Sequence, residues 1–242
     1  MTAVVRVPAG GPSPSWEDAG LGGGLDSVGG ANPMSVGYET VASRQVYADK
    51  VVALRVDDVR MPGGQVAERA VVSRPAAVTI VALDDDGRVF LLSQYRHPVG
   101  GFLLELPAGL LDKPGETPYE AARRELYEEA ALRAATWHTL ADLRVSPGAL
   151  DQLVRIYLAR DLTVVPEDAR YELGQAGEYE EADFRTEWRT LDDAVEQVHS
   201  GEIQNSGTVA GLLAAYTARA LRWKPLRPAD LPWPAPLGSP AR

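Results

Sequence analysis

The chain has 242 residues, a formal net charge of −10 and a pI near 4.8, which argues against nonspecific binding to nucleic acids or anionic membranes. It contains no cysteine, which excludes disulfides and cysteine-ligated zinc, and the spacing of its 3 histidines does not suit a zinc site. No apolar run reaches membrane-spanning length and the N-terminus lacks a signal-peptide pattern, so a soluble cytoplasmic protein is expected.

The two ends of the chain differ in composition from its middle. Residues 1–38 are rich in Gly, Pro, Ser and Ala, and they carry too little apolar surface to offset the entropy lost on ordering. They are predicted to form a disordered tail. Residues 224–242 contain repeated prolines and are predicted to form an extended Pro-rich tail, in which Trp233 offers an anchor.

Between the tails, apolar alternation and short apolar runs predict a chain made mostly of strands. Strands are expected at residues 46–60, 65–73, 77–83, 88–95, 136–145 and 153–160, with a further strand in the segment 179–189. Helices are expected from Pro118 onwards, at 191–199 and at 206–221. We therefore predict an α+β fold, with an N-terminal β-hairpin region at 39–74 and one larger domain at 75–223.

The stretch from Gly109 to Leu132 carries the strongest local signal in the sequence. Thr117 suits the N-cap of a helix, Pro118 suits its first position, and Thr117 with Glu120 fits a capping box. The helix is therefore predicted to begin at Pro118.

On that helix, Glu125, Glu128 and Glu129 stand at i, i+3 and i+4, which places three carboxylates on one face. Arg124 is within reach of Glu128, but one cation does not neutralise three anions. One interpretation is a solvated acidic face, because such faces are common on surface helices. The other is a site for Mg²⁺ or Mn²⁺, which prefer oxygen ligands.

The spacing of the whole stretch resembles the Nudix box, G-x5-E-x7-R-E-U-x-E-E-x-G-U, in which U is a bulky aliphatic residue. Glu116, seven intervening residues and the run Arg124-Glu125-Leu126-Tyr127-Glu128-Glu129 match it in register. Two departures are visible: six residues separate Gly109 from Glu116, and Ala131 stands where the family has glycine. The resemblance implies the Nudix α/β/α sandwich, with a mixed β-sheet and an N-terminal antiparallel β subdomain.

Motifs outside the box resemble the ADP-ribose pyrophosphatase branch of this family. They are Gln94-Tyr95-Arg96, Glu105-Leu106-Pro107-Ala108-Gly109, Ser146-Pro147-Gly148, Glu180-Glu181-Ala182-Asp183 and Gly201-Glu202-Ile203-Gln204-Asn205. One departure lies in residues 148–152, Gly-Ala-Leu-Asp-Gln, where relatives usually carry Phe-Ser-Asp-Glu after the glycine.

The resemblance assigns roles to the acidic residues. Glu125 and Glu129 are the expected metal ligands, Glu128 supports metal binding and catalysis, and the carbonyl of Ala108 is a further ligand. An ordinary turn residue is an equally good interpretation of Ala108. The catalytic base of this branch comes from a loop outside the box, which favours Glu181, with Glu180 second. A solvated acidic loop is the alternative for this pair.

Three residues are expected to contact the substrate. Arg96 is the candidate for a phosphate clamp, because a guanidinium matches two phosphate oxygens. An ion pair between Arg96 and Glu105 is the alternative role for both. Arg69 resembles an arginine that contacts the nucleotide in relatives, where N-terminal strands of two subunits complete each other's pocket, so a homodimer is implied. The aromatic side chains Tyr95, Trp137 and Trp188 are expected in the core rather than stacked on a ligand.

These features lead to three hypotheses about function. The first is a Mg²⁺-dependent hydrolase that cuts the pyrophosphate of ADP-ribose to AMP and ribose 5-phosphate. The second is the same chemistry on another nucleoside diphosphate derivative, such as a nucleotide sugar or a dinucleotide. The third is a Nudix-like binding or regulatory module without turnover, which the intact carboxylates of the box argue against.

Overall fold

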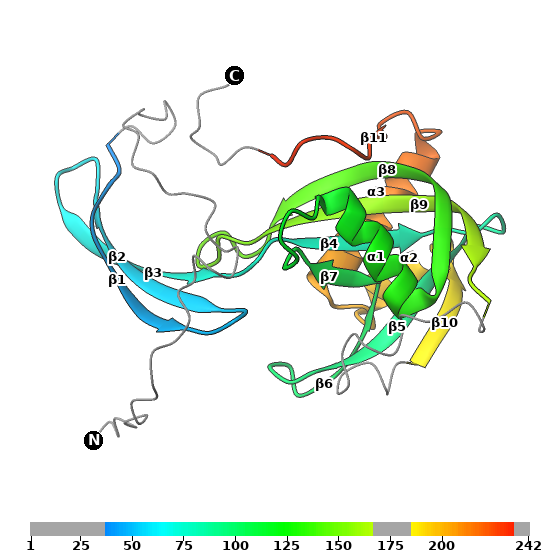
Figure 1. The fold of residues 1–242 in the computed structure, drawn as a ribbon, viewed down its shortest axis with the longest axis horizontal. Coiled ribbons are helices and arrows are strands. Elements are labelled where there is room, and N and C mark those ends of the chain that lie inside the picture. Colours follow the sequence, from blue (N-terminus) through cyan, green and yellow to red (C-terminus); the bar gives the residue numbers. More distant parts are fainter. Residues whose placement is uncertain (1–36, 167–184, 235–242) are drawn as a thin grey trace.

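The computed structural model describes residues 37–166 and 185–234, which contain three β-sheets and three α-helices (Figure 1). None of the helices in these ranges has the length and apolar character needed to cross a bilayer. The predicted tail at 1–38 lies almost wholly outside the described residues.

The N-terminal sheet is antiparallel and has three strands, β1 (Glu39–Ala48), β2 (Ala53–Arg60) and β3 (Val66–Ser73). The prediction of one strand over 46–60 was wrong, because the chain reverses between β1 and β2. The carboxylate of Asp49 accepts hydrogen bonds from the backbone N–H groups of Val51 and Val52, at 2.8 and 2.7 Å, and thereby holds this turn.

This sheet extends to one side of the rest of the protein and joins it at the end of β3 (Figure 1). Val72 pairs with Leu150 in a parallel bridge, and the hydroxyl of Ser73 donates to the carboxylate of Asp151 at 2.6 Å. Arg55 reaches the same carboxylate from β2, at 3.4 Å. The N-terminal sheet is therefore joined to the rest of the protein by the loop at 145–152. This loop contains residues 148–152, whose sequence departs from that of the relatives.

The central sheet has five strands in the order β11-β8-β9-β4-β7. Its strands are β4 (Ala77–Ala82), β7 (Ala108–Leu110), β8 (Leu132–Arg144), β9 (Leu153–Val164) and β11 (Arg227–Pro228). β4 and β9 run parallel, whereas the other neighbours run antiparallel. The predicted mixed sheet is confirmed.

A smaller antiparallel sheet has the order β10-β5-β6. Its strands are β5 (Arg88–Arg96), β6 (Gly101–Glu105) and β10 (Arg185–Thr190). Neither β6 nor β7 is predicted from the sequence, because both are short and their residue patterns are typical of loops.

Helices cover both faces of the central sheet, with α1 (Pro118–Ala130) on one side and α2 (Leu191–Ser200) and α3 (Ser206–Ala220) on the other (Figure 1). The residues of β4 alternate between the two cores: Ile80 packs in the α1 cluster with Leu126, and Val81 packs in the α2–α3 cluster with Leu212. Burial on both faces explains the continuous apolar run of this strand. The predicted α+β sandwich is confirmed.

The box helix begins where the sequence predicts. Thr117 caps it, Pro118 is its first residue, and the reciprocal bonds of the capping box with Glu120 are both present. At its end Ala131 adopts the left-handed conformation, with φ 51°, and donates its N–H to the carbonyls of Leu126 and Tyr127. The helix exit therefore keeps the geometry that glycine usually provides, without the glycine.

The segment after α3 packs on the domain rather than leaving it. The buried guanidinium of Arg155 donates to the carbonyls of Leu231 and Pro232 at 2.6 and 3.0 Å, and to Asp142 at 2.7 Å. The guanidinium also lies 5.1 Å from the ring centroid of Trp233. Residues 227–233 therefore form a clasp over Arg155, with Trp233 as its anchor.

A chain truncated after Leu226 is expected to lose about 3–5 kcal/mol of unfolding free energy. It would leave a buried guanidinium without two of its acceptors, and hydrogen bonds to charged groups contribute about 1.5–3 kcal/mol each. Thermal unfolding should show a loss of roughly 10 °C in Tm. A chain ending at Pro234 keeps every contact of the clasp and is the control; equal Tm values for the two truncations would contradict the prediction.

Candidate active site

Arg124 is the centre of the box and holds three of its carboxylates. Its guanidinium donates to Glu116 at 2.8 and 2.9 Å, to Glu125 at 2.5 Å and to Glu128 at 2.9 Å. The amine of Lys113 lies 3.5 Å from the other oxygen of Glu128. The hydrogen bonds to Glu116 raise the pKa of Arg124, and burial opposes this rise. The box thus contains a fixed, permanently charged cation, and its bond to Glu128 agrees with their spacing of four on the helix.

Glu125 lies against the backbone of the box loop. Its side chain is 12% exposed and it presses against Gly109, where an added Cβ would lie 2.0 Å from the carboxylate carbon. Real Cβ atoms do not approach other atoms so closely, so this position requires glycine for space. The sequence pattern contains this glycine but does not reveal its partner.

Two of the predicted metal ligands are in direct contact. The backbone N–H of Ala108 donates to the carboxylate of Glu129 at 2.8 Å, which ties α1 to β7. Among the described residues, no three Asp, Glu or His side chains are grouped closely enough to form a metal cage. Glu125 and Glu128 are instead turned towards Arg124, and Glu129 towards the amide of Ala108.

The positive charge near Glu125 does not fully compensate the burial of its carboxylate. Burial raises the pKa of Glu125 to about 7, although Arg124 pulls it down. Glu128 and Asp112 raise it further. A divalent cation with a preference for oxygen ligands would relieve this deficit, and the donors present are all oxygens. The residues therefore fit a Mg²⁺ or Mn²⁺ site chemically.

The raised pKa of Glu125 predicts that Mg²⁺ affinity rises with pH. A carboxyl group whose pKa is raised in the folded state stabilises the metal-free fold at pH values below its ordinary pKa of 4.5. This stabilisation is lost as the pH rises through about 7. Metal binding needs the ionised form, so we expect about tenfold tighter binding at pH 8 than at pH 6.

Calorimetric titration with Mg²⁺ at the two pH values measures this dependence. Glu125→Gln should abolish it, whereas Glu196→Gln, an exposed acidic position on α2, should keep it. Equal affinity of the unmodified protein at pH 6 and pH 8 would show that Glu125 does not bind the metal.

The predicted phosphate clamp Arg96 forms a bidentate ion pair with Glu105, at 2.9 and 2.7 Å. Glu105 is 2% exposed, whereas the arginine side chain is 38% exposed. The two residues sit on neighbouring strands, β5 and β6. The ion pair, which is the alternative role considered for Arg96 and Glu105, is therefore the one seen, and the arginine side chain stays partly exposed.

Arg69 is not brought to the box within one chain (Figure 1). Arg69 is exposed on β3, where it donates to the carbonyl of Glu68 at 2.8 Å. Glu180 and Glu181 lie outside the described residues.

The expectation of core burial holds for one of three aromatic residues. Trp137 is 8% exposed, but Tyr95 is 50% exposed and Trp188 is 37% exposed, so for these two the prediction was wrong. Tyr95 pairs edge-on with the exposed ring of Phe102, and Trp188 with Phe90. Both are exposed positions of the smaller sheet, and sequence periodicity did not distinguish them from core positions.

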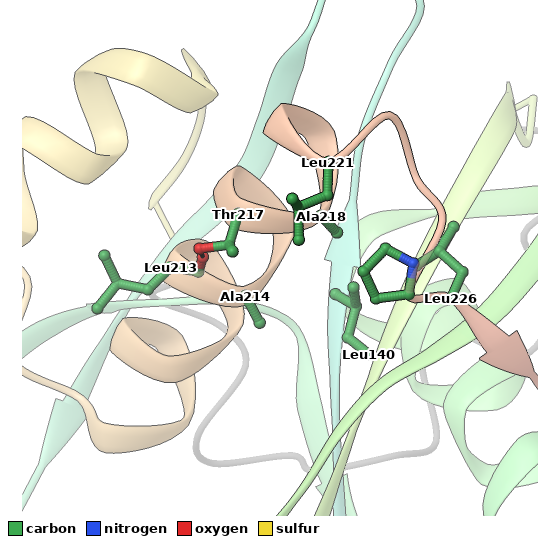
Figure 2. A pocket seen from close by; sticks show the side chains of 8 residues that line it. Leu140, Leu213, Ala214, Thr217, Ala218, Leu221 and Leu226 are labelled. Carbon is green, nitrogen blue, oxygen red and sulfur yellow. Dashed lines mark hydrogen bonds between the residues drawn. The ribbon is translucent and has the colours of Figure 1, made fainter.

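An apolar pocket of about 400 Å³ lies beside α3, which covers the face of the central sheet opposite to α1 (Figure 1). Leucine and alanine side chains of α3 line it, together with Leu140 of β8 and Leu226 (Figure 2). The hydroxyl of Thr217 is bonded to the carbonyl of Leu213. The lining contains no charged group that could bind a phosphate, so the candidate active site is the box and not this pocket.

Comparison with known proteins agrees with this geometry. Residues 73–209 match the model of the NUDIX domain, and residues 38–72 match that of the nucleoside diphosphate sugar hydrolase N-terminal domain. The chain is 43% identical over 196 residues to an ADP-ribose pyrophosphatase of Mycobacterium tuberculosis, covering 81% of this chain and 91% of that protein. It is 32% identical over 188 residues to an ADP-ribose pyrophosphatase of Bacillus subtilis, covering 78% and 97%.

A crystal structure of an ADP compounds hydrolase superposes with a TM-score of 0.63 at 21% identity. The superposition covers 76% of this chain and 95% of that one. At this identity the likeness concerns the fold.

Proposed function

The chain belongs to the Nudix family and is a Nudix hydrolase, and on that premise we propose that it hydrolyses the pyrophosphate bond of ADP-ribose to AMP and ribose 5-phosphate with Mg²⁺. The observation that carries the proposal is the box itself. A buried carboxylate with a pKa raised to about 7 is pressed against Gly109 beside two further carboxylates of α1. The similarity to two ADP-ribose pyrophosphatases over most of their length supports the substrate.

In this proposal the metal is held by Glu125, Glu128 and Glu129 together with the carbonyl of Ala108, with Mn²⁺ as an alternative to Mg²⁺. When bound, the metal neutralises charge on the phosphates. Arg124 keeps the carboxylates together by holding Glu125 and Glu128.

The remaining roles fall to residues around the box. Arg96 orients a phosphate, and Glu105 fixes the direction of its guanidinium through the bidentate pair. Glu181, or Glu180, takes the proton from the attacking water.

We further propose that the protein is a homodimer in which the N-terminal sheets pack against the partner subunit. β1 is exposed along almost its whole length, including the large apolar side chains Val41, Val46 and Tyr47. Tyr95 and Phe102 add a second exposed apolar region on the β5–β6 hairpin. Such an arrangement would carry Arg69 towards the partner's substrate. A monomeric mass by light scattering would contradict it.

The cytoplasm stays the predicted location.

A second candidate is hydrolysis of another nucleoside diphosphate derivative. The match of residues 38–72 to an N-terminal domain of nucleoside diphosphate sugar hydrolases favours a nucleotide sugar. The residues Gly148-Ala149-Leu150-Asp151-Gln152, which depart from the pattern expected near the terminal ribose, point the same way.

A substrate panel tests the proposal. ADP-ribose, ADP-glucose, UDP-glucose and a dinucleotide are incubated with Mg²⁺, and phosphate is measured after phosphatase treatment, which attacks only the products. We expect ADP-ribose to give the highest kcat/KM, with no turnover in EDTA and little in Glu129→Gln. A higher kcat/KM for a nucleotide sugar would favour the second candidate. Equal turnover with Mg²⁺ and with EDTA would overturn both.

A further inference from the structure

A second, smaller pocket of about 280 Å³ lies between the box helix and the strand that follows it. Its lining comes from α1 and the first half of β8: Glu120, Arg123, Arg124, Tyr127, Arg133, Ala134 and Trp137. The α1 residues at 120, 123, 124 and 127 recur at spacings of three and four, so they share one face of the helix. That face is a different one from the face of Glu125 and Glu129.

The charge in this pocket comes from two arginines that the fold positions against aromatic rings. The guanidinium of Arg123 lies 5.7 Å from the ring centroid of Tyr119, and that of Arg133 lies 5.6 Å from the ring centroid of Tyr127. Neither guanidinium has an ion-pair partner within residues 37–166 and 185–234. Both are exposed at the pocket, in a chain whose net charge is −10.

The acidic residue of the lining, Glu120, makes no direct bond to these arginines, although hydrogen bonds from Thr117 and, to a smaller extent, the charge of Arg123 lower its pKa. The carboxylate of Glu120 accepts from the N–H of Thr117 at 2.9 Å and from its hydroxyl at 2.8 Å, as the second half of the capping box. The third arginine, Arg124, is fully engaged by the box carboxylates. The indole N–H of Trp137 is bonded to the carbonyl of Ala134 at 3.0 Å. Two arginines without an ion-pair partner in the described part of the chain, and one carboxylate held by the capping box, therefore face a hollow with aromatic walls.

These features define the class of ligand. A guanidinium offers two parallel N–H donors that match a phosphate, and two of them suit a doubly charged anion. The volume is near the lower end of the roughly 300–1,000 Å³ typical of small-molecule sites. It accommodates a phosphate with a small attached group and is too small for a complete dinucleotide.

We propose that this pocket is a binding site for a phosphate monoester, separate from the substrate site. Arg123 and Arg133 hold the phosphate, and the rings of Tyr127 and Trp137 flank the group attached to it. The proposal concerns binding alone and does not depend on which substrate the enzyme hydrolyses.

Isothermal titration with ribose 5-phosphate tests the site, on the full chain in EDTA at constant ionic strength. The double variant Arg123→Gln/Arg133→Gln removes both donors. The variant Arg44→Gln/Arg60→Gln removes the same charge from exposed positions of the N-terminal sheet. Arg96→Gln removes the proposed clamp of the substrate site. Melting temperatures without ligand verify folding, and Arg133→Glu alone serves as a second pocket variant if the double variant is unstable.

We expect saturable binding by the unmodified protein, at least tenfold weaker binding by either pocket variant, and unchanged binding by the other two variants. Absence of saturable binding by the unmodified protein would overturn the proposal. So would equal losses in the two double variants, which would indicate a general charge effect. Loss of binding in Arg96→Gln would place the ligand in the substrate site and would equally overturn it.

Discussion

Replacing Gly109 with alanine is expected to lower turnover about a hundredfold while leaving the melting temperature almost unchanged. The added methyl group would lie 2.0 Å from the carboxylate carbon of Glu125, so one of the two must move. The end of a flexible side chain moves more readily than the backbone of β7, so Glu125 should be displaced and the fold retained. Moving one proposed metal ligand removes charge stabilisation that the reaction needs.

The measurement is steady-state hydrolysis of ADP-ribose, together with thermal unfolding and a Mg²⁺ titration. Gly63→Ala is the matched control, because the glycine has an ordinary φ and a Cβ there meets no atom within 4 Å. We expect weaker Mg²⁺ binding by Gly109→Ala and unchanged behaviour of the control. Full activity of Gly109→Ala would show that Glu125 need not occupy its observed position. A large loss in Tm would indicate instead that the backbone yields.

Glu181→Gln is expected to reduce kcat by about a hundredfold to ten-thousandfold, the range typical of a general base. KM and Mg²⁺ affinity should change little, because the proposed ligands on α1 are untouched. Glu180→Gln should have a milder effect. This prediction depends on the resemblance of residues 180–183 to the family motif, because both residues lie outside the described part of the chain.

Hydrolysis of ADP-ribose at saturating Mg²⁺, measured across pH for all three proteins, separates the outcomes. If Glu180 is the base, the two effects should exchange. If neither change lowers kcat by tenfold, the base lies elsewhere, and a box carboxylate would have to activate the water. The acidic limb of the pH profile should be altered in the variant that has lost the base.

The sequence by itself determined the features that depend on neighbouring residues. The start of α1 could be predicted because Thr117 and Glu120 satisfy each other's backbone N–H groups within a single turn, and Pro118 suits the first helical position. The bond of Arg124 to Glu128 follows from their spacing of four on a helix. The continuous apolar run at 77–83 predicted β4, since a strand buried on both faces has no polar alternation.

Other features required the tertiary structure, because they join residues far apart in the chain. The contact of Gly109 with Glu125 depends on how α1 packs against β7. The pairing of Arg96 with Glu105 depends on the register of β5 and β6. The sequence predicts only an extended tail where the clasp over Arg155 forms, because prolines indicate extended chain but do not reveal that a buried cation binds its carbonyls.

The same distinction explains the errors in detail. The strand predicted over 46–60 is divided by a turn at Asp49, and its flanking valines continue the apolar pattern across the turn. Arg69 lies on a sheet that extends away from the box within one chain, so the substrate contact proposed for it would need a second subunit (Figure 1). Local hydrogen bonds and periodicity are encoded within a few residues. The positions of separate elements are set by the packing of two cores and by strand register, to which the whole chain contributes.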